Sequence, residues 1–266
     1  MVLKTYSMKQ LFNIIAISAG FLFASCDKQA LELTAQSSAT VAFIHAAPTP
    51  PPQPPSLAPA VDILVDNQLA NGSRRLSYGL VSVSGGSGNG AAYMPIMPGS
   101  RSIKLSPDSG KVNFINATLQ FDAKKAYTVV AYDTLPVSGA QTLRAVQLTD
   151  DLTVPAGTNV HVRFLHLAPL APAVDVTLLR TGSSPDSVTL TNRSYLGATP
   201  NAATLSAFTP IPGATAYTLR VKLAGTQTVV FTTSLGATLT SGRIVTLAAI
   251  GSARGQALGA MALRHY

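Results

Sequence analysis

Two histidines and two aspartates recur in almost the same phrase at two places in the chain. His45 lies in VAFIHAAP and is followed by Asp62 in APAVDI, whereas His166 lies in VRFLHLAP and is followed by Asp175 in APAVDV. An imidazole beside a carboxylate can act as an acid–base couple or bind a metal ion. Each pair offers two ligands where zinc takes three or four. We therefore expect the pairs to hold strand ends together through backbone hydrogen bonds, with the two members of a pair coupled in energy.

A catalytic site needs more residues than either pair supplies. A cleft between the two copies that gathered His45, Asp62, His161 and Asp175 around a metal ion would provide them. The sequence has no phosphate-binding loop, dinucleotide-binding glycine motif or HExxH zinc motif, and GGSGN around Ser87 lacks the last glycine of a nucleophile elbow. We expect no catalytic residue, no bound metal and no cofactor, and rank a metal-dependent enzyme last.

The start of the chain has the pattern of a targeting signal. Two lysines precede an apolar run over residues 11–23, which is too short to cross a bilayer core of roughly 30 Å as a helix. The phrase FASC ends at Cys26, the only cysteine, and resembles the lipobox of bacterial lipoproteins, with phenylalanine in place of the usual leucine. This resemblance implies that residues 1–25 are a lipoprotein signal peptide, that Cys26 carries lipid such as palmitate, and that residues 26–39 form a tether.

The anchor and the charge limit where the chain works and what it contacts. Acyl chains on Cys26 would attach it to a membrane, so we expect a membrane-anchored lipoprotein of the cell envelope, on the outer membrane. The inner membrane stays open as the alternative, as does whether the protein faces the periplasm or the cell surface. The formal charge is +8, from 19 basic and 11 acidic residues, but the basic residues are scattered along the sequence. We expect no nucleic-acid partner, because that binding needs a clustered basic face.

The rest of the chain has the composition of an all-β protein. Only 11% of residues are charged, and β-branched runs alternate with turn signals rich in Gly, Pro and Asn. We predict two tandem immunoglobulin-like β-sandwich domains, over residues 40–153 and 159–266, that fold separately. The expected strands are residues 42–46, 61–65, 102–105, 113–119, 127–132 and 144–148 in the first copy, and 161–166, 174–178, 216–223, 228–232, 244–250 and 260–264 in the second.

Further phrases align between the two copies and identify a family. PIMPG at residues 95–99 matches PIPG at residues 210–213, and LTDD at residues 148–151 closes the first copy. Together with the repeated histidine phrase, these resemble the bacterial domain of unknown function 4397, from about residue 40 to the end of the sequence. The resemblance implies a tandem duplicate in a secreted or lipid-anchored protein, and it brings no established activity.

Two triplets resemble a bacterial acceptor sequence for general O-glycosylation. They are Asp133-Thr134-Leu135 and Asp186-Ser187-Val188. Thr134 and Ser187 are therefore candidate modification sites.

These observations predict a non-catalytic, lipid-anchored protein of the cell envelope that presents two β-sandwich modules for binding or adhesion. Its partner would be an envelope protein or a glycan of unknown identity. The chain contains no tryptophan, which weakens the case for a sugar-stacking platform. The alternative is a structural subunit of a surface adhesin or nutrient-capture assembly.

Overall fold

The computed structural model describes residues 37–48, 59–72, 75–81, 93–134, 143–181, 187–252 and 257–265. The predicted signal peptide, Cys26 and most of the tether lie outside these residues. Within them no helix is long and apolar enough to cross a membrane.

We call Ala39–Asp150 the first half and Asn159–His265 the second half. The strands of the first half are β1 (Ala39–His45), β2 (Asp62–Val65), β3 (Gln68–Leu69), β4 (Leu80–Val81), β5 (Met94–Ile96), β6 (Gly99–Ser106), β7 (Ile115–Phe121), β8 (Ala126–Tyr132) and β9 (Arg144–Asp150). The second half has β10 (Asn159–His166), β11 (Val174–Arg180), β12 (Ser187–Arg193), α2 (Ala202–Ser206), β13 (Thr209–Pro212), β14 (Tyr217–Leu223), β15 (Val229–Gly236), η2 (Ala237–Leu239), β16 (Ile244–Ile250) and β17 (Gly259–Arg264).

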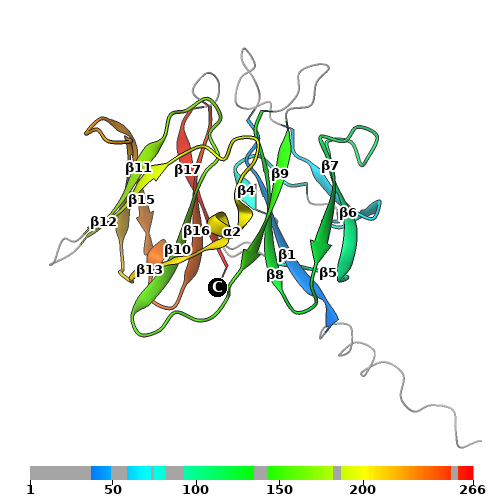
Figure 1. The fold of residues 1–266 in the computed structure, drawn as a ribbon, viewed down its shortest axis with the longest axis horizontal. Helices are drawn as coiled ribbons and strands as arrows, with labels where there is room; N and C mark the ends of the chain where they lie inside the picture. The colour runs from blue at the N-terminus through cyan, green and yellow to red at the C-terminus, as the bar shows by residue number, and fades with distance from the viewer. Residues whose placement is uncertain are drawn as a thin grey trace, which may run out of the picture. The chain divides into compact units, whose positions relative to one another are not determined.

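The two halves share one order of strands (Figure 1). In the first half β1 pairs in parallel with β8, which pairs with β9, while β4 and β5 cover the other edge of β1. The facing sheet runs β3–β2–β6–β7. In the second half the orders are β13–β10–β16–β17 and β12–β11–β14–β15, again with a parallel central pair, β10 and β16. The all-β sandwich prediction is confirmed, and the parallel pair distinguishes these sheets from the antiparallel sheets of immunoglobulin domains.

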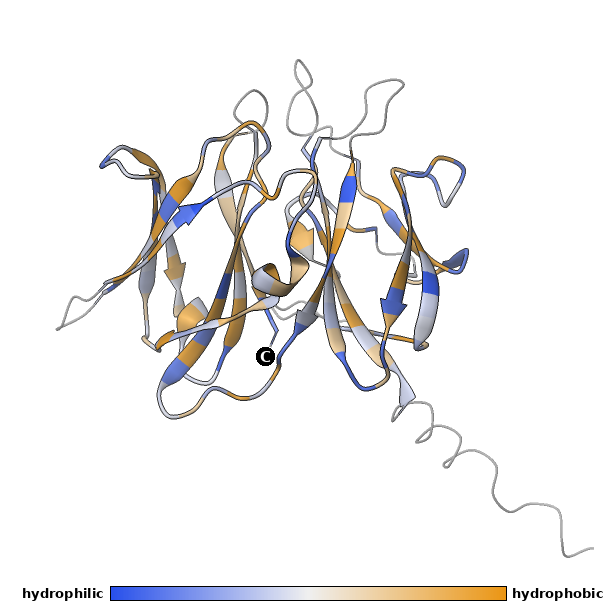
Figure 2. Ribbon diagram, viewed as in Figure 1, coloured by the Kyte–Doolittle hydropathy of each residue, from blue (hydrophilic) through white to orange (hydrophobic). Residues whose placement is uncertain are grey.

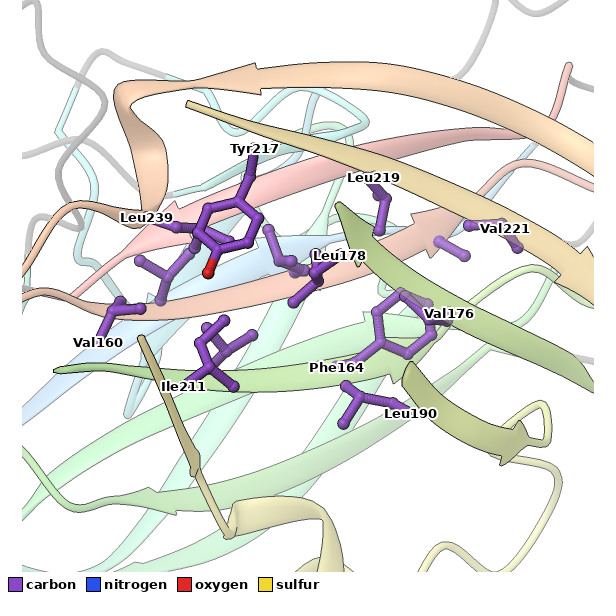
Figure 3. Close-up of a cluster of buried hydrophobic side chains, with 14 of the residues drawn as sticks. Val160, Phe164, Val176, Leu178, Leu190, Ile211, Tyr217, Leu219, Val221 and Leu239 are labelled. Atoms are coloured by element: carbon purple, nitrogen blue, oxygen red, sulfur yellow. The ribbon is translucent and has the colours of Figure 1, made fainter. Parts of the chain in front are cut away.

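An apolar core lies between the two sheets of each half. In the second half Phe164 of β10 packs with Val176 and Leu178 of β11 and Leu219 of β14 (Figure 3). The first half has an equivalent core that includes Phe43. The outer strand β7 alternates buried and exposed residues, visible as orange and blue bands in Figure 2, because only one of its faces meets a core.

A third apolar cluster joins the two halves. Successive side chains of a strand point to opposite faces, so Phe43 enters the first core while the next residue, Ile44, enters the third cluster. Phe164 and Leu165 divide between the second core and the third cluster in the same way. The sheets that contain β1 and β10 are thus covered on both faces, which explains their nearly continuous apolar runs. Residues Ser38–Tyr266 accordingly form one compact unit.

Each predicted strand overlaps an observed one, but some elements were missed. β12 carries threonines, an asparagine and an arginine, and it gave no strong apolar alternation. The short helix α2 begins after Asn201, whose side chain accepts a hydrogen bond of 3.2 Å from the Thr204 amide as an N-cap. Separate folding of the two halves stays a prediction, and the third cluster means that a separated half would expose apolar residues to water.

Candidate functional site

The two histidines of the repeated phrase close corresponding strands and make the same contact. His45 ends β1 and His166 ends β10, and both are buried. Nε2 of His45 lies 3.2 Å from the carbonyl oxygen of Pro59, and Nε2 of His166 lies 3.0 Å from that of Pro172. Because a carbonyl oxygen only accepts, Nε2 donates in both halves. Each imidazole therefore ties the end of a strand to the proline-containing segment that follows it.

A tyrosine ring packs edge to face against each of these histidines. The ring centroids of His45 and Tyr78 are 6.0 Å apart with the planes at 88°, and those of His166 and Tyr195 are 6.2 Å apart at 73°. Such edge-to-face pairs are favourable beyond the area that they bury. These tyrosines were not predicted from the sequence, although a serine directly before each of them marks a second phrase shared by the two halves.

Asp62 holds two neighbouring segments beside its strand. Its Oδ2 atom accepts hydrogen bonds from the Ser109 amide at 3.0 Å and the Ser109 hydroxyl at 3.1 Å, in the turn between β6 and β7. On the other side the Arg75 guanidinium donates to both carboxylate oxygens, at 3.2 and 3.1 Å. The hydrogen bond from Arg75 is the main cause that lowers the pKa of Asp62, with further help from Ser109.

Asp175 likewise holds two neighbouring segments in the second half, but its hydrogen-bond donors are backbone amides. Its carboxylate accepts hydrogen bonds from the Asn192 amide at 2.8 Å and from the Gly225 amide at 2.9 Å. Gly225 lies in the turn between β14 and β15, the counterpart of the turn that Asp62 holds. These two amides lower the pKa of Asp175. Both aspartates thus fasten the same hairpin turn to the start of the neighbouring strand.

The structure gives each histidine and aspartate its own partners. Among the hydrogen bonds of the described residues, none joins His45 to Asp62 or His166 to Asp175. His161 lies five residues before His166 on β10, about 17 Å away along an extended strand. The described residues also contain no group of three or more His, Cys, Asp or Glu side chains placed to hold a metal ion. The stabilising role of the four residues stays a prediction, now with defined contacts.

A comparison of the sequence with protein-family models identifies the family of this chain. The family model described as "Domain of unknown function (DUF4397)" matches residues 39–177, more than half of the chain. The chain belongs to the DUF4397 family. The matched stretch contains both histidines and both aspartates of the repeated phrase, whereas Tyr195, Asn192 and Gly225, which contact the second pair, lie beyond it. No curated protein matches the sequence.

A buried polar network joins the two halves of this DUF4397 protein, and it was not predicted. Arg163 of β10 and Asp150 of β9 form an ion pair of 2.8 Å, with side chains only 1% and 0% exposed. The same guanidinium donates to the hydroxyl of Thr246 at 3.0 Å and to that of Thr128 at 3.2 Å. It also lies 4.6 Å from the centre of the Phe208 ring, a cation–π distance. The buried guanidinium is therefore paired with a carboxylate, hydrogen-bonded to two hydroxyl groups and packed against an aromatic ring.

His265 and Tyr93 complete the network on the far side of Asp150. The Tyr93 hydroxyl donates to the Asp150 carboxylate at 2.8 Å and also contacts Nδ1 of His265. Asp150 and His265 hold matching positions in the two halves, since one lies opposite the start of β8 and the other bonds to the start of β16. Burial lowers the pKa of His265 to about 4. The network's charged pair is shielded from solvent, so it can fix the two halves together but cannot meet a substrate.

The proposed modification sites lie apart from these contacts. Thr134 follows β8, and its amide donates to Asp133 at 3.0 Å. Ser187 begins β12 and is exposed. Cys26 lies outside the described residues. Modification of all three residues stays a prediction.

We predict that His166 and Asp175 stabilise the fold independently. Replacing His166 with alanine leaves the buried Ala168 amide unpaired and should cost about 1–3 kcal/mol, whereas the amides that Asp175 binds are exposed to water, so Asp175→Ala should cost about 0.5–1.5 kcal/mol. Because the two side chains share no partner, the double variant should cost the sum of the two to within about 0.5 kcal/mol, which replaces the coupling expected from the sequence. Urea unfolding measures all three values, and His161→Ala, half-exposed on the same strand, is the matched control. A double variant that costs much less than the sum would show that the pair acts as a unit.

Acid should destabilise the protein over the range in which buried histidines resist protonation. Desolvation lowers the pKa of His45 to about 4, and His265 behaves alike. Between their unfolded pKa of about 6.5 and this value the unfolded chain binds protons that the folded chain does not, so stability is complete above pH ~6.5 and falls toward pH ~4. The pKa of Asp62 is lowered from 3.8, so its own acid effect begins lower.

The unfolding free energy at pH 7.0 and pH 4.5 measures this effect. The fall between the two values should be smaller in His45→Gln than in the wild type, while His161→Gln should keep the full fall. An equal fall in His45→Gln and the wild type would contradict the assignment.

Proposed function

We propose that this protein is a lipid-anchored, non-catalytic component of the cell envelope that presents two duplicated β-sandwich modules for binding. Three shared features support the duplication: the strand order, the histidine phrase and the histidine–tyrosine packing. The polar residues of the repeated phrase are engaged with backbone groups and with Arg75, which supports a framework role for them.

The proposal is carried by the direction of β1. The chain enters this strand at Ala39 and reaches His45 at the other end, a span of about 20 Å at 3.3 Å per residue. The parallel strand β8 runs the same way and ends at Tyr132 (Figure 1). Ala39, where the chain enters the strand, and His45 therefore lie at opposite ends of the first half.

The second half presents its histidine at that same distal end. The Tyr132 hydroxyl donates to the carbonyl oxygen of Gly197 at 3.1 Å, and its ring lies 6.2 Å from that of Tyr195. Tyr195 in turn packs on His166, so the ends of β8 and β10 meet. Ala39, where the chain enters the first half from the side of the predicted anchor, thus lies at the end opposite both histidines, which supports the distal ends as the place where a partner binds.

We predict that Cys26→Ala releases the protein from membranes. Without the Cys26 thiol the protein cannot be acylated. Each methylene of an acyl chain that is buried in the membrane contributes about 0.8 kcal/mol to the attachment. Cells that express the wild type, Cys26→Ala or the control Ser25→Ala are labelled with a palmitate analogue, fractionated and washed with carbonate. The wild type and the control should carry label and stay in the membrane pellet. A Cys26→Ala protein that stays in the pellet would contradict the anchor.

A further inference from the structure

We propose that the distal end of the second half binds a leucine-sized aliphatic side chain of a partner polypeptide. The proposal rests on the binding function above and names its partner's chemistry. A pocket of about 70 Å³ opens there between the two sheets. Its walls include Val174 of β11, Val221 of β14, Val230 and Phe231 of β15, and Leu258, with His166 beside them.

The pocket exists because the second half carries smaller residues than the first at matching positions. When the strand pair β2–β6 of the first half is superposed on the strand pair β11–β14 of the second half, Leu105 of β6 matches Val221 of β14. The next hairpin aligns Phe114 with Val230, since Ile115 lies opposite Leu105 as Phe231 lies opposite Val221. Phe231 is larger than its counterpart, but it is only half-buried and forms a wall of the pocket.

The first half also fills this region with a leucine from its own chain. Leu76 is buried beside Val61, and the two residues exchange backbone hydrogen bonds of 2.8 and 2.9 Å. The matching position opposite Val174 is Arg193. The first half thus shows how a leucine held by a polypeptide backbone packs against this sandwich, and the second half lacks that leucine.

The size and chemistry of the pocket select the occupant. An apolar cavity that binds benzene has a volume of roughly 150 Å³, so a pocket of half that size suits a branched aliphatic group better than an aromatic ring. His166 offers the occupant no hydrogen bond, because its Nε2 donates to Pro172 and its Nδ1 accepts from the Ala168 amide. The exposed side chains of Leu170, at 63%, and Val229, at 49%, extend apolar surface near this end.

A polar group on the strand next to one pocket wall favours a peptide over a lipid. Arg193 of β12 does not line the pocket itself, but it lies opposite Val174, which does, in the pairing of β11 with β12. The Nε atom of Arg193 is buried and has no hydrogen-bond partner within the described structure. A peptide brings a carbonyl oxygen next to its side chain and can satisfy that nitrogen, whereas the end of an acyl chain cannot. The pocket also lies at the end of the sheets opposite Ala39, where the chain leaves toward the predicted anchor.

Methyl NMR of the full chain tests this proposal with small probes. N-acetyl-leucine methylamide should produce saturable shifts of the Val174, Val221, Val230 and Leu258 methyl groups, and N-acetyl-alanine methylamide should produce none. Val221→Leu combined with Val230→Phe introduces the larger residues of the first half, which should fill the pocket and abolish the shifts. The control Val229→Leu, which enlarges a residue outside the pocket, should keep them. Arg193→Gln should weaken the binding of the leucine probe severalfold.

Several outcomes would overturn the proposal. One is a filled double variant that still responds to the leucine probe, and another is a pocket that responds to octanoate but not to the leucine probe. If the double variant does not fold, Val221→Leu alone serves and should reduce the shifts. A folded wild type without any probe shift would refute the pocket's role and leave the anchor result unaffected, because membrane fractionation does not depend on the pocket.

Discussion

The buried ion pair between Arg163 and Asp150 is the constraint on which the arrangement of the two halves depends. Charges removed from water cost several kcal/mol each unless they are paired and hydrogen-bonded. Arg163 belongs to the second half and Asp150 to the first, so both are satisfied only when the two sheets meet in one register. The apolar cluster around them favours contact without selecting a register, because apolar attraction has no direction. The ion pair therefore supplies the specificity and the cluster supplies most of the driving force.

The sequence was informative about features that depend on local patterns. Alternation and turn residues predicted the main strands, and the repeated phrase located His45 and His166 at strand ends. The sequence could not show that Arg163 is buried. Its hydrogen-bond partners come from distant parts of both halves, and by composition alone it counts as one of the basic residues scattered along the chain. The sequence also paired each histidine with the nearby aspartate, whereas the ring contact is made by a tyrosine further along the chain.

The two halves share the same framework but differ in the side chains that line it. In each, a histidine fastens a strand end and an aspartate fastens a hairpin turn, so the titratable groups that suggested chemistry are engaged in holding the sandwich. Side-chain differences on this common framework, such as Leu105 against Val221, then leave the second half with a pocket. That pocket lies at the end of the sheets opposite Ala39. We therefore propose that the shared framework holds the fold of this DUF4397 protein, while side-chain differences between its halves form the binding pocket.

A double-mutant cycle on the buried ion pair tests the central claim most directly. Arg163→Met and Asp150→Leu should each cost about 3–5 kcal/mol, since each leaves a buried charge unpaired, and the double variant should cost far less than the sum. The exposed pair of Arg101 and Asp66, 3.0 Å apart on the first half, is the control and should give a coupling of at most about 1 kcal/mol. Additive costs for Arg163 and Asp150, or single costs as small as those of the exposed pair, would contradict the account.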